Sequence, residues 1–333
     1  MRIGVVGAGA VGGTMAALLD RVGHLVEVTA RGQQLTAIRA DGIALDGAWG
    51  QHRAHVTAAE TLGQVPDLAV VCTKAQDAAA AIRENSHLLT GVPVVIVQNG
   101  LAGLNEAAAL LPESDCVGAL ALFAASYLSP GRVTVTTAAT TYIGAGEGEP
   151  PEAAVFAARV LDAAMPAVAI DNFTGSQWTK LIVNQINAMP AITGLSVQET
   201  LGERSLRRIV TAGMREAVRI GFARGIHYGS IQGLSQGILR FIASAPLWAA
   251  QFVPLLMKRR MGDVPNPGST LQSIRRGQLT EIDYLNGAIV TEAARLGWEA
   301  PVNSALVGLV HEVERTGAFL PPTVVADRMR GLV

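Results

Sequence analysis

The sequence contains little that would mark a secreted, metal-binding or nucleic-acid-binding protein. Only two of its 333 residues are cysteines, Cys72 and Cys116, and both lie in apolar stretches. Two cysteines cannot form a disulfide framework, so we expect buried thiols in a reducing cytoplasm. The six histidines form no HxxxH pattern and no cluster with cysteine, so no metal site is predicted. The formal net charge of −1 gives no basic field for nucleic acid or an anionic membrane.

A long hydrophobic run is also missing. The most apolar stretch, residues 241–257, is shorter than a bilayer span and contains Pro246, Gln251 and Pro254. We therefore predict no membrane helix, and we interpret this stretch as buried helices or as a subunit contact. A homodimer formed through the helical half of the chain is the expected assembly.

Strand-like runs alternate with helical stretches through the first half of the chain, which is typical of a doubly wound sheet. The runs are residues 3–6, 25–30, 68–72, 92–97, 133–137 and 141–144, followed by a helix over 153–165 and a strand over 167–170. From residue 174 onward helical periodicity dominates. Because 333 residues are too many for one comfortable core, we predict two domains. They are an α/β, Rossmann-type domain over 1–170 and a mainly α-helical domain over 171–333.

The most specific motif is the glycine loop, residues 7–13, which directly follows the first apolar run. Gly7 permits a tight turn, Gly9 lets backbone approach a pyrophosphate, and Gly12 lets the next helix pack on the strand. The start of that helix adds unpaired N–H groups and a positive dipole end. We expect a dinucleotide there, rather than a plain strand-to-helix turn. The residues predicted to surround its pyrophosphate are Gly7, Ala8, Gly9, Ala10, Val11 and Gly12.

The end of the second strand indicates which dinucleotide binds. NAD enzymes usually place an acidic residue at this point, whereas this chain has Arg31. A guanidinium suits the 2′-phosphate of NADP, because it donates two parallel charge-assisted hydrogen bonds. The alternative is that Glu27 binds the ribose and Arg31 is only a surface charge. Glu27 lies inside the strand and not at its tip, so we favour NADP(H).

Two predicted neighbouring strands end in polar residues. Thr73 and Lys74 follow the strand over 68–72, and Gln98, Asn99 and Gly100 follow the strand over 92–97. Ligands of such sheets bind at the carboxyl ends of the strands, so we expect these side chains at the ligand. Ordinary loop polarity is the alternative for each pair alone.

A polar stripe, Lys180, Asn184 and Asn187, marks the first helix of the second half. These residues stand at i, i+4 and i+7, so on one continuous helix they share a face. The rest of the helix is largely apolar, with Trp178, Leu181, Ile182, Ile186 and Met189. One lysine with two asparagines is more typical of a pocket lining than of a solvated charged face.

A second polar cluster follows a Pro/Gly loop and contains Ser269, Thr280, Glu281 and Asp283. Thr280 and Asp283 have a spacing similar to a capping box, which predicts a helix with Glu281 in its first turn. Glu281 could act in the site, or it could simply be a favourable charge at a helix start. Spacing alone does not choose between these.

Taken together, these features resemble the ketopantoate reductase (2-dehydropantoate 2-reductase) family over nearly the whole chain. The resemblance depends on an ordered set of motifs: the glycine loop, Arg31, Val-Val-Cys-Thr-Lys74, Gln-Asn99-Gly, Trp-Thr-Lys180 with Asn184, and Ser269 before Thr-Glu281-Ile-Asp-Tyr-Leu-Asn-Gly. It implies NADPH-dependent reduction of a small 2-oxo acid, with 2-dehydropantoate reduced to pantoate for pantothenate and CoA synthesis. The first domain would bind NADP(H), and the second would bind substrate and form the dimer.

The same resemblance implies a role for each candidate residue. Lys180 would be the proton donor, and the substrate contacts would be Lys180, Asn184, Asn187 and Ser269. Besides the glycine loop and Arg31, the cofactor would meet Lys74, Asn99, Ala124 and Glu281. Glu281 would also help to close the site over both ligands and so take part in catalysis.

This assignment is consistent with elementary chemistry. A hydride arriving at C2 of a 2-oxo acid builds negative charge on the oxygen, so a cation that can give a proton is needed nearby. Lysine has an ordinary pKa of about 10.4, which burial of Lys180 would lower and a carboxylate such as Glu281 would hold up. We expect this ammonium to meet the nicotinamide held by the first domain.

Two departures from the family pattern concern the substrate. Asn187 follows Asn184 by three residues, where the family has four, and residues 196–198 offer no match for a further substrate asparagine. A relative that reduces another 2-oxo acid, carbonyl or imine therefore stays open. A non-catalytic NADP-binding sensor is the alternative from another class.

Overall fold

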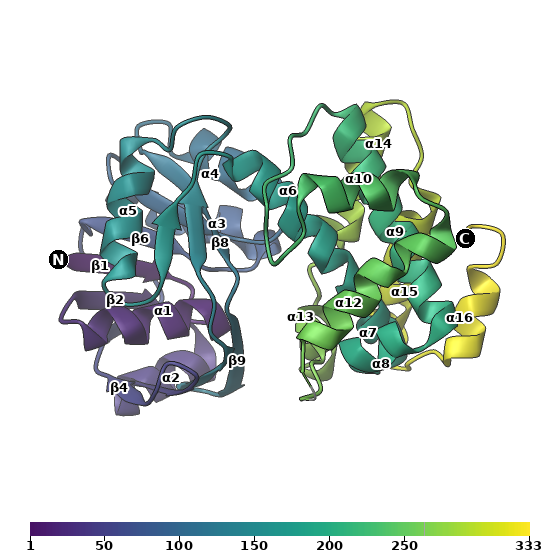
Figure 1. Ribbon diagram of the computed structural model, residues 1–333. Helices are drawn as coiled ribbons and strands as arrows, with labels where there is room; N and C mark the ends of the chain where they lie inside the picture. Colours follow the sequence, from purple (N-terminus) through teal and green to yellow (C-terminus); the bar gives the residue numbers. More distant parts are fainter. Residues whose placement is uncertain (263) are drawn as a thin grey trace. The chain divides into compact units, whose positions relative to one another are not determined.

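The computed structural model describes residues 1–262 and 264–333, and the contacts within it form two compact units, Met1–Phe173 and Thr174–Val333. The first unit is built of strands and helices, and the second is helical (Figure 1). The predicted class, a Rossmann-type sheet followed by a mainly α-helical part, is confirmed.

An eight-stranded sheet forms the centre of the first unit, with the order β12-β11-β8-β7-β6-β1-β2-β5. Strands β8, β7, β6, β1, β2 and β5 pair in parallel with their neighbours in this series. Strand β11 runs antiparallel to β8. The strands are β1 (Arg2–Val6), β2 (Leu25–Thr29), β5 (Thr57–Ala59), β6 (Leu68–Val71), β7 (Val94–Val97), β8 (Cys116–Ala121), β11 (Thr141–Gly144) and β12 (Ala167–Ala169). Every residue of β6 and β7 is buried, as expected for apolar runs covered on both faces. The carboxyl ends of β1, β2, β6 and β7 consequently share one edge.

A second sheet, with the order β4-β3-β10-β9, lies outside this arrangement. Its strands are β3 (Ile43–Gly47), β4 (His52–Ala54), β9 (Ala124–Ser129) and β10 (Arg132–Thr137). The prediction that residues 133–137 belong to the doubly wound sheet is therefore wrong. In β10, Val133 and Val135 are buried while Thr136 is exposed, the alternation of a sheet covered on one face only.

Five helices complete the first unit: α1 (Ala10–Arg21), α2 (Gly32–Asp41), α3 (Ala75–Leu89), α4 (Gly103–Leu110) and α5 (Glu152–Asp162). Helix α1 contacts β1 and β2 of the large sheet as well as β3, β4, β9 and β10 of the small one, so it packs between the two sheets. Met15 and Leu18 of α1 are fully buried in one core cluster with Ile43 and Val133 of the small sheet. Ile82 and Leu89 of α3 belong to a separate cluster with β6 and β7.

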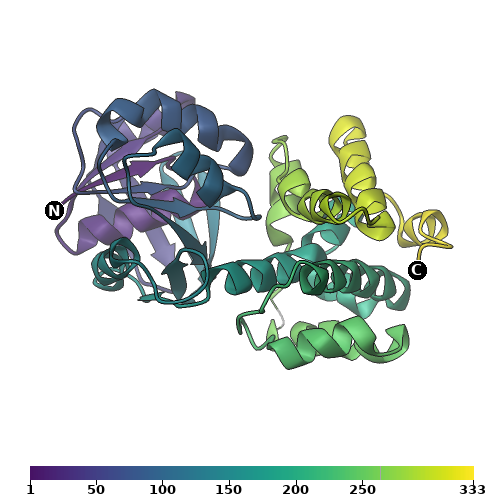
Figure 2. The same cartoon turned by 90° about the horizontal axis from the view of Figure 1, so that it is seen from above.

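The second unit is a set of helices around α9. The elements are α6 (Phe173–Asn184), η1 (Gln185–Asn187), α7 (Ala188–Thr193), α8 (Val197–Gly202), α9 (Arg204–Ala223), α10 (Gln236–Ser244), α11 (Leu247–Ala250), α12 (Phe252–Arg260), α13 (Gly268–Arg275), η2 (Ile282–Tyr284), α14 (Asn286–Arg295), α15 (Pro301–Thr316) and α16 (Pro322–Arg328). Helix α9 contacts α8, α10, α11, α14, α15 and α16, and its long buried face forms the centre of this unit (Figure 2).

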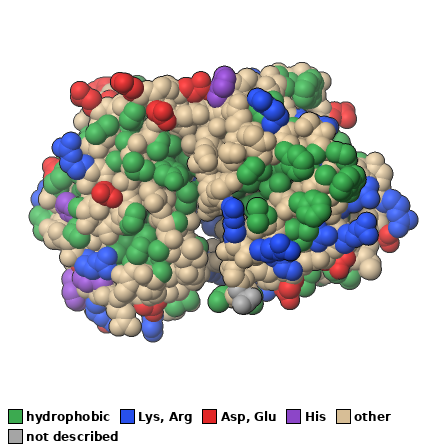
Figure 3. Space-filling view, viewed as in Figure 1, with side chains coloured by type: hydrophobic (Ala, Val, Ile, Leu, Met, Phe, Trp, Pro, Cys, Tyr) green, Lys and Arg blue, Asp and Glu red, His purple; other side chains and the backbone are tan. Residues whose placement is uncertain are grey.

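The apolar stretch 241–257 folds as parts of α10, α11 and α12. Ile242 and Ala250 are buried, but Phe241, Trp248 and Phe252 are exposed. Of the two expectations, buried helices are therefore found only in part, and a subunit contact stays a prediction. Figure 3 shows hydrophobic side chains gathered on this face of the second unit, with lysine and arginine beside them. Among the described residues, no helix has both the length and the apolar character needed to span a bilayer.

The two cysteines also differ from expectation. Both are free thiols, but each is partly rather than fully buried. Burial raises the pKa of Cys72 to about 12 and that of Cys116 to about 11, so both stay protonated near neutral pH.

Candidate active site

The glycine loop of the first unit is shaped by close backbone approaches. Gly7 has a φ of 100°, a conformation that favours glycine. A Cβ on Gly12 would lie 1.9 Å from the carbonyl oxygen of Gly7, whereas a Cβ on Gly9 would meet nothing within 4 Å. Gly12 is therefore needed for helix α1 to pack on the loop, and Gly9 leaves an open backbone surface at the start of α1. The tight turn at Gly7 and the close packing at Gly12 agree with the spacing, whereas the approach of a pyrophosphate to Gly9 stays a prediction.

Two residues that sequence reasoning missed hold this loop in shape. The backbone N–H of Gly7 donates to Oγ1 of Thr29 at 2.9 Å, and that of Ala8 donates to the Thr29 carbonyl at 3.0 Å. The Gln34 amide donates to the Ala8 carbonyl at 2.7 Å and accepts from the backbone N–H of Gly131 at 2.7 Å. The position of Thr29 as the last residue of β2 is the signal that could have identified it. Gln34 carries no comparable signal, because its partner Gly131 is distant in sequence.

Arg31 and Glu27 have different surroundings. Oε1 of Glu27 accepts a hydrogen bond at 2.7 Å from the backbone N–H of Gly63, which lies outside β2, so one oxygen of this carboxylate is already engaged. Arg31 precedes α2, and its exposed side chain forms an ion pair with Glu84 of α3 at 2.5 Å. A phosphate at Arg31 would therefore compete with, or lie beside, the carboxylate of Glu84.

The polar ends of β6 and β7 lie next to each other, as predicted, because these strands are adjacent and parallel. The Gln98 amide donates to the Thr73 carbonyl at 3.4 Å and links the two ends. Lys74 is the N-cap residue of α3, and Asn99 lies two residues after the end of β7. Oγ1 of Thr73 is buried and has no hydrogen-bond partner within residues 1–262 and 264–333. A buried hydroxyl beside the glycine loop is a group that a bound nucleotide can satisfy.

Ala124 was expected among the cofactor contacts on the basis of family resemblance. It is the first residue of β9, is partly buried, and accepts a hydrogen bond at its carbonyl from Thr136 Oγ1 at 3.2 Å. Ala124 therefore belongs to the small sheet rather than to an end of the large one.

The polar stripe of the second unit does not lie on one continuous α-helix. Lys180 and Asn184 belong to α6, which ends at Asn184, and a 3₁₀ turn over Gln185–Asn187 follows. Pro190 explains the interruption, since its ring cannot donate to the carbonyl of Ile186 and clashes with it in a regular helix. Residues three apart are aligned in a 3₁₀ turn, and the Asn187 amide indeed lies 3.5 Å from Asn184 Oδ1. The unusual spacing of the asparagines is thus matched by a local change of helix type.

Ser269 joins this group from α13. Nδ2 of Asn187 lies 3.5 Å from Ser269 Oγ, and Ser269 itself is exposed at the start of the helix. The preceding Gly268 has a φ of 71°, and a Cβ there would lie 2.7 Å from Asn187 Oδ1. Glycine at 268 therefore lets α13 approach the asparagine pair, which brings a hydroxyl and two amides together from separate segments.

Lys180 is the charged member of this site. It is partly buried on a helix whose neighbours Trp178, Leu181 and Ile182 are buried. Burial lowers its pKa from 10.5 to about 8, and the negative charge of Glu281 opposes that decrease. The charge of Glu281 therefore favours the ammonium form of Lys180, although 101 positions separate the two residues in the chain (281 − 180).

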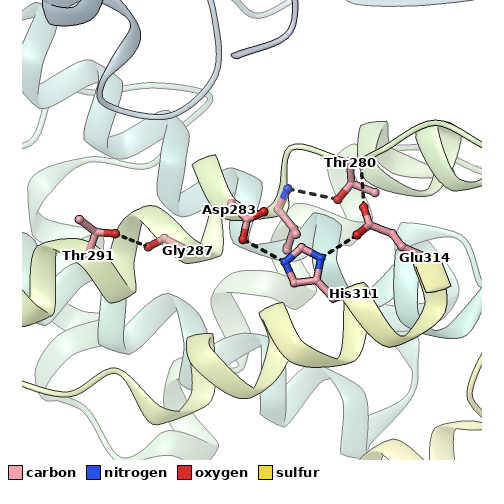
Figure 4. A network of polar contacts seen from close by, with 7 residues as sticks. Thr280, Asp283, Gly287, Thr291, His311 and Glu314 are labelled. Carbon is pink, nitrogen blue, oxygen red and sulfur yellow. Dashed lines mark hydrogen bonds and ion pairs between the residues drawn. The ribbon is translucent and has the colours of Figure 1, made fainter. Parts of the chain in front are cut away.

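The predicted helix beginning at Thr280 is wrong. Glu281 precedes a single 3₁₀ turn, η2, and the next α-helix starts only at Asn286. Oγ1 of Thr280 accepts from the Ile282 N–H at 3.2 Å, but Asp283 does not complete a capping box. Instead Asp283 Oδ1 lies 3.0 Å from Nε2 of His311 on α15 (Figure 4). The tertiary contact with α15 outweighs the local capping pattern.

Within the second unit the structure therefore gathers Lys180 with Glu281, and Asn184 with Asn187 and Ser269. Within the first unit it places the glycine loop beside the ends of β6 and β7. In the part of the chain that is described, no group of His, Cys, Asp or Glu is arranged to hold a metal ion. The sequence did not predict that Thr280 contacts Glu314 or that Asp283 contacts His311. These pairs are 34 and 28 positions apart, and helix α14 lies between them in the chain.

Comparisons with known proteins extend over both units. The family model described as "Ketopantoate reductase PanE/ApbA" matches residues 3–148, and the one described as "Ketopantoate reductase PanE/ApbA C terminal" matches residues 172–314. A 2-dehydropantoate 2-reductase of Archaeoglobus fulgidus is 27% identical over 315 residues, which cover 94% of this chain and 98% of that protein.

Two solved structures share the fold. A PanE/ApbA family ketopantoate reductase from Ralstonia eutropha JMP134 has a TM-score of 0.79 at 28% identity, over 95% of this chain and 99% of that one. The ternary structure of D-mandelate dehydrogenase with NADH and anilino(oxo)acetate has a TM-score of 0.80 at 21% identity, over 95% and 99% of the two chains. The second likeness is one of fold alone.

Proposed function

The chain belongs to the ketopantoate reductase family, and we propose that it reduces 2-dehydropantoate to pantoate with NADPH as reductant. The observation that carries this proposal is the site around Lys180. A partly buried ammonium with a pKa of about 8 lies near Glu281, on the same chain segment as two amides that meet a hydroxyl. These are the groups that a small, anionic 2-oxo acid requires.

Lys180 is the proposed proton donor. When bound, the nicotinamide supplies a hydride to C2 of the substrate. Nζ of Lys180 stabilises the negative charge that develops on the carbonyl oxygen and then gives it a proton, which completes the 2-hydroxy acid. A pKa of about 8 suits this role, because the amine is still mostly protonated at neutral pH yet gives up its proton more readily than an ordinary lysine.

Asn184, Asn187 and Ser269 are the proposed substrate contacts. Amides and hydroxyls can donate to the carboxylate and also accept from the substrate hydroxyl, and they add no net charge. Asn184 and Asn187 are joined by a 3₁₀ turn, which places their side chains on the same face. The backbone conformation therefore contributes, together with the side-chain rotamers, to the 3.5 Å distance between their amide groups. This local difference from the family spacing favours a second candidate, reduction of a different 2-oxo acid at the same site.

The first unit contains residues that fit a dinucleotide. The open backbone at Gly9, the N–H groups at the start of α1 and the buried hydroxyl of Thr73 fit a pyrophosphate and its ribose. Gly7, Ala8, Ala10, Val11 and Gly12 complete the proposed loop, and Lys74, Asn99 and Ala124 are further proposed cofactor contacts. Glu281 is a proposed cofactor contact from the second unit. Arg31 is the proposed 2′-phosphate ligand, since Glu27 is engaged by Gly63. The preference for NADPH over NADH is thus part of the proposal.

We also propose a role for each domain and a dimeric assembly. Residues 1–170 would bind NADP(H), and residues 171–333 would bind substrate and form a homodimer, to which the exposed aromatic side chains of α10–α12 could contribute. The activity would supply pantoate for pantothenate synthesis in the cytoplasm.

Steady-state rates across a panel of substrates test the proposal. We expect kcat/KM for 2-dehydropantoate with NADPH to exceed that for pyruvate, 2-oxoisovalerate and phenylglyoxylate by about tenfold or more. Lys180→Ala should lower kcat on the order of 10²-fold or more, because it removes the proton donor. Lys258→Ala, which removes a lysine of α12, is the matched control and should retain turnover.

Each other outcome has a definite meaning. A preference for another 2-oxo acid would reject 2-dehydropantoate and favour the second candidate. Nucleotide binding without turnover of any oxo acid would reject an enzyme in favour of a sensor. Near-normal turnover in Lys180→Ala would eliminate Lys180 as the proton donor.

A further inference from the structure

Glu281 lies in a segment that has little structure of its own. Residues 276–285 connect α13 to α14 and contain only the single turn η2, while residues 275–279 are exposed. Local hydrogen bonds within the segment include those from the Ile282 N–H to Thr280 Oγ1 and from the Leu285 N–H to the Glu281 carbonyl. Such a connection does not hold a side chain in place unless a rigid neighbour anchors it.

Helix α15 provides that anchor at both sides of Glu281. The Thr280 N–H donates to Glu314 Oε1 at 2.8 Å, and Nε2 of His311 lies 3.0 Å from Asp283 Oδ1. The other ring nitrogen of His311 lies 2.7 Å from Glu314 Oε2, so the two contacts form one connected group (Figure 4). We call Thr280, Asp283, His311 and Glu314 the α15 clamp.

The clamp requires a charged histidine. Both ring nitrogens of His311 face carboxylates, and only the imidazolium can donate to both. Burial acts to lower the pKa of His311, but the hydrogen bonds to Glu314 and Asp283, together with their charges, raise it above its usual 6.5. A neutral ring would donate to one carboxylate and present a lone pair to the other, which breaks one half of the clamp.

The surroundings of His311 contribute few other charges. Helix α15 packs on η2, α14, α7 and α9. Helix α7 has no ionisable side chain, Glu292 of α14 pairs with Arg224 and Arg295, and Glu216 of α9 accepts from backbone N–H groups of Val302 and Asn303. Arg328 of α16 also reaches α15, where it pairs with Glu312. Asp283 and Glu314 remain the groups that raise the pKa of His311.

We propose that protonated His311 is a positioning residue, which holds Glu281 beside Lys180 by clamping the Glu281 segment to α15. The inference rests on the proposed function, because it concerns the proton donor of that reaction. His311 touches neither substrate nor cofactor in this account, and it acts only through the segment between Thr280 and Asp283. When His311 loses its proton, Glu281 is less firmly held and supports the ammonium of Lys180 less.

The three lysines of the chain, Lys74, Lys180 and Lys258, make a direct test possible. NMR of ¹³C-labelled lysine side chains should give three resonances, of which Lys180→Arg identifies one, and their pH titration reports the pKa of Lys180 without any substrate. We expect His311→Gln to lower that pKa by about 0.5 unit or more. Asp283→Asn should give a similar shift, and the double variant should add little to either.

Restoration and a matched control complete the design. His311→Arg keeps a permanent cation that can pair with carboxylates, so it should return the pKa of Lys180 towards the wild-type value. Glu312 lies next to His311 on α15 and pairs with Arg328 of α16, so Glu312→Gln breaks a neighbouring ion pair; it should leave both that pKa and turnover unchanged. In turnover assays, the alkaline limb of the kcat/KM profile of His311→Gln should move by the same amount as the NMR titration.

An unchanged Lys180 pKa in folded His311→Gln and Asp283→Asn would overturn the clamp, and so would a shift that His311→Arg fails to reverse. Equal shifts in Glu312→Gln would also overturn it, since they would indicate a general effect of disturbing α15. Failure of the proposed function is recognised separately, because it would appear as a wild-type protein that turns over no 2-oxo acid while the lysine titrations remain measurable.

Discussion

The candidate sites of the two units are built from different material. In the first unit the candidate site is mostly backbone: Gly7 and Gly12 shape a loop that leaves no room for their side chains, and Gly9 leaves its backbone open. In the second unit it is made of side chains, and Lys180 owes its pKa of about 8 to burial and to a carboxylate 101 positions away (281 − 180). In the first site the space around the backbone decides which residues fit, whereas in the second site burial and charge decide the pKa of Lys180. Substitutions should therefore affect binding in one unit and proton transfer in the other.

The largest expected effect in the backbone-built site comes from Gly12→Ala. Its Cβ would lie 1.9 Å from the Gly7 carbonyl oxygen, so the loop or α1 must shift. We expect a loss of about 1–3 kcal/mol in the free energy of unfolding and strongly weakened nucleotide binding. Chemical denaturation and titration calorimetry with NADPH measure the two effects.

Gly9→Ala separates the effect on stability from the effect on nucleotide binding. A Cβ there meets nothing within 4 Å in the protein, so the free energy of unfolding should change by less than about 1 kcal/mol. The added methyl group should still obstruct the phosphates and raise the dissociation constant of NADPH about tenfold, or about 1.4 kcal/mol. Unchanged binding in Gly9→Ala would mean that the nucleotide does not approach this backbone.

A smaller effect is expected at Arg31, the charged contact proposed for the 2′-phosphate. Arg31 is exposed, so its pairing with a 2′-phosphate should be worth about 1 kcal/mol, and Arg31→Ala should lower the preference for NADPH over NADH about fivefold. Glu84→Gln removes the competing carboxylate and should increase the preference by a smaller factor. Ratios of kcat/KM for the two nucleotides provide the measurement, and an unaltered ratio in Arg31→Ala would refute NADP selection by this residue.

What the sequence predicts well is local. The glycine loop, the apolar runs of β1, β2, β6 and β7 and the polar ends of β6 and β7 are each encoded within a few neighbouring residues. Residues 133–137 were placed in the wrong sheet, because the pairing of β10 with β3 joins segments far apart in the chain, and alternation alone does not specify it. Thr29 could have been recognised at the end of β2, whereas the partners of Gln34 could not.

The second unit was harder to predict for the same reason. The helix of the polar stripe was correct as far as Asn184, and Pro190 in hindsight explains the 3₁₀ turn that follows. The helix expected at Thr280 failed because Asp283 pairs with His311 across 28 positions. Tertiary contacts from α13 and α15 decide this site, and no single segment contains them. Whether the predicted residues bind ligand stays a prediction for experiment.

The central claim is that Lys180 donates the proton and that the carboxylate of Glu281 favours its charged form. The pH dependence of kcat/KM in the wild-type protein and in Glu281→Gln tests this claim most directly. Lys180 donates only when protonated, so activity should be retained below its pKa of about 8 and lost as the pH rises through it. Glu281→Gln removes the opposing charge and should move this alkaline limb to lower pH. A profile that stays flat up to the ordinary lysine pKa of about 10.4, or a limb that Glu281→Gln leaves in place, would contradict the account.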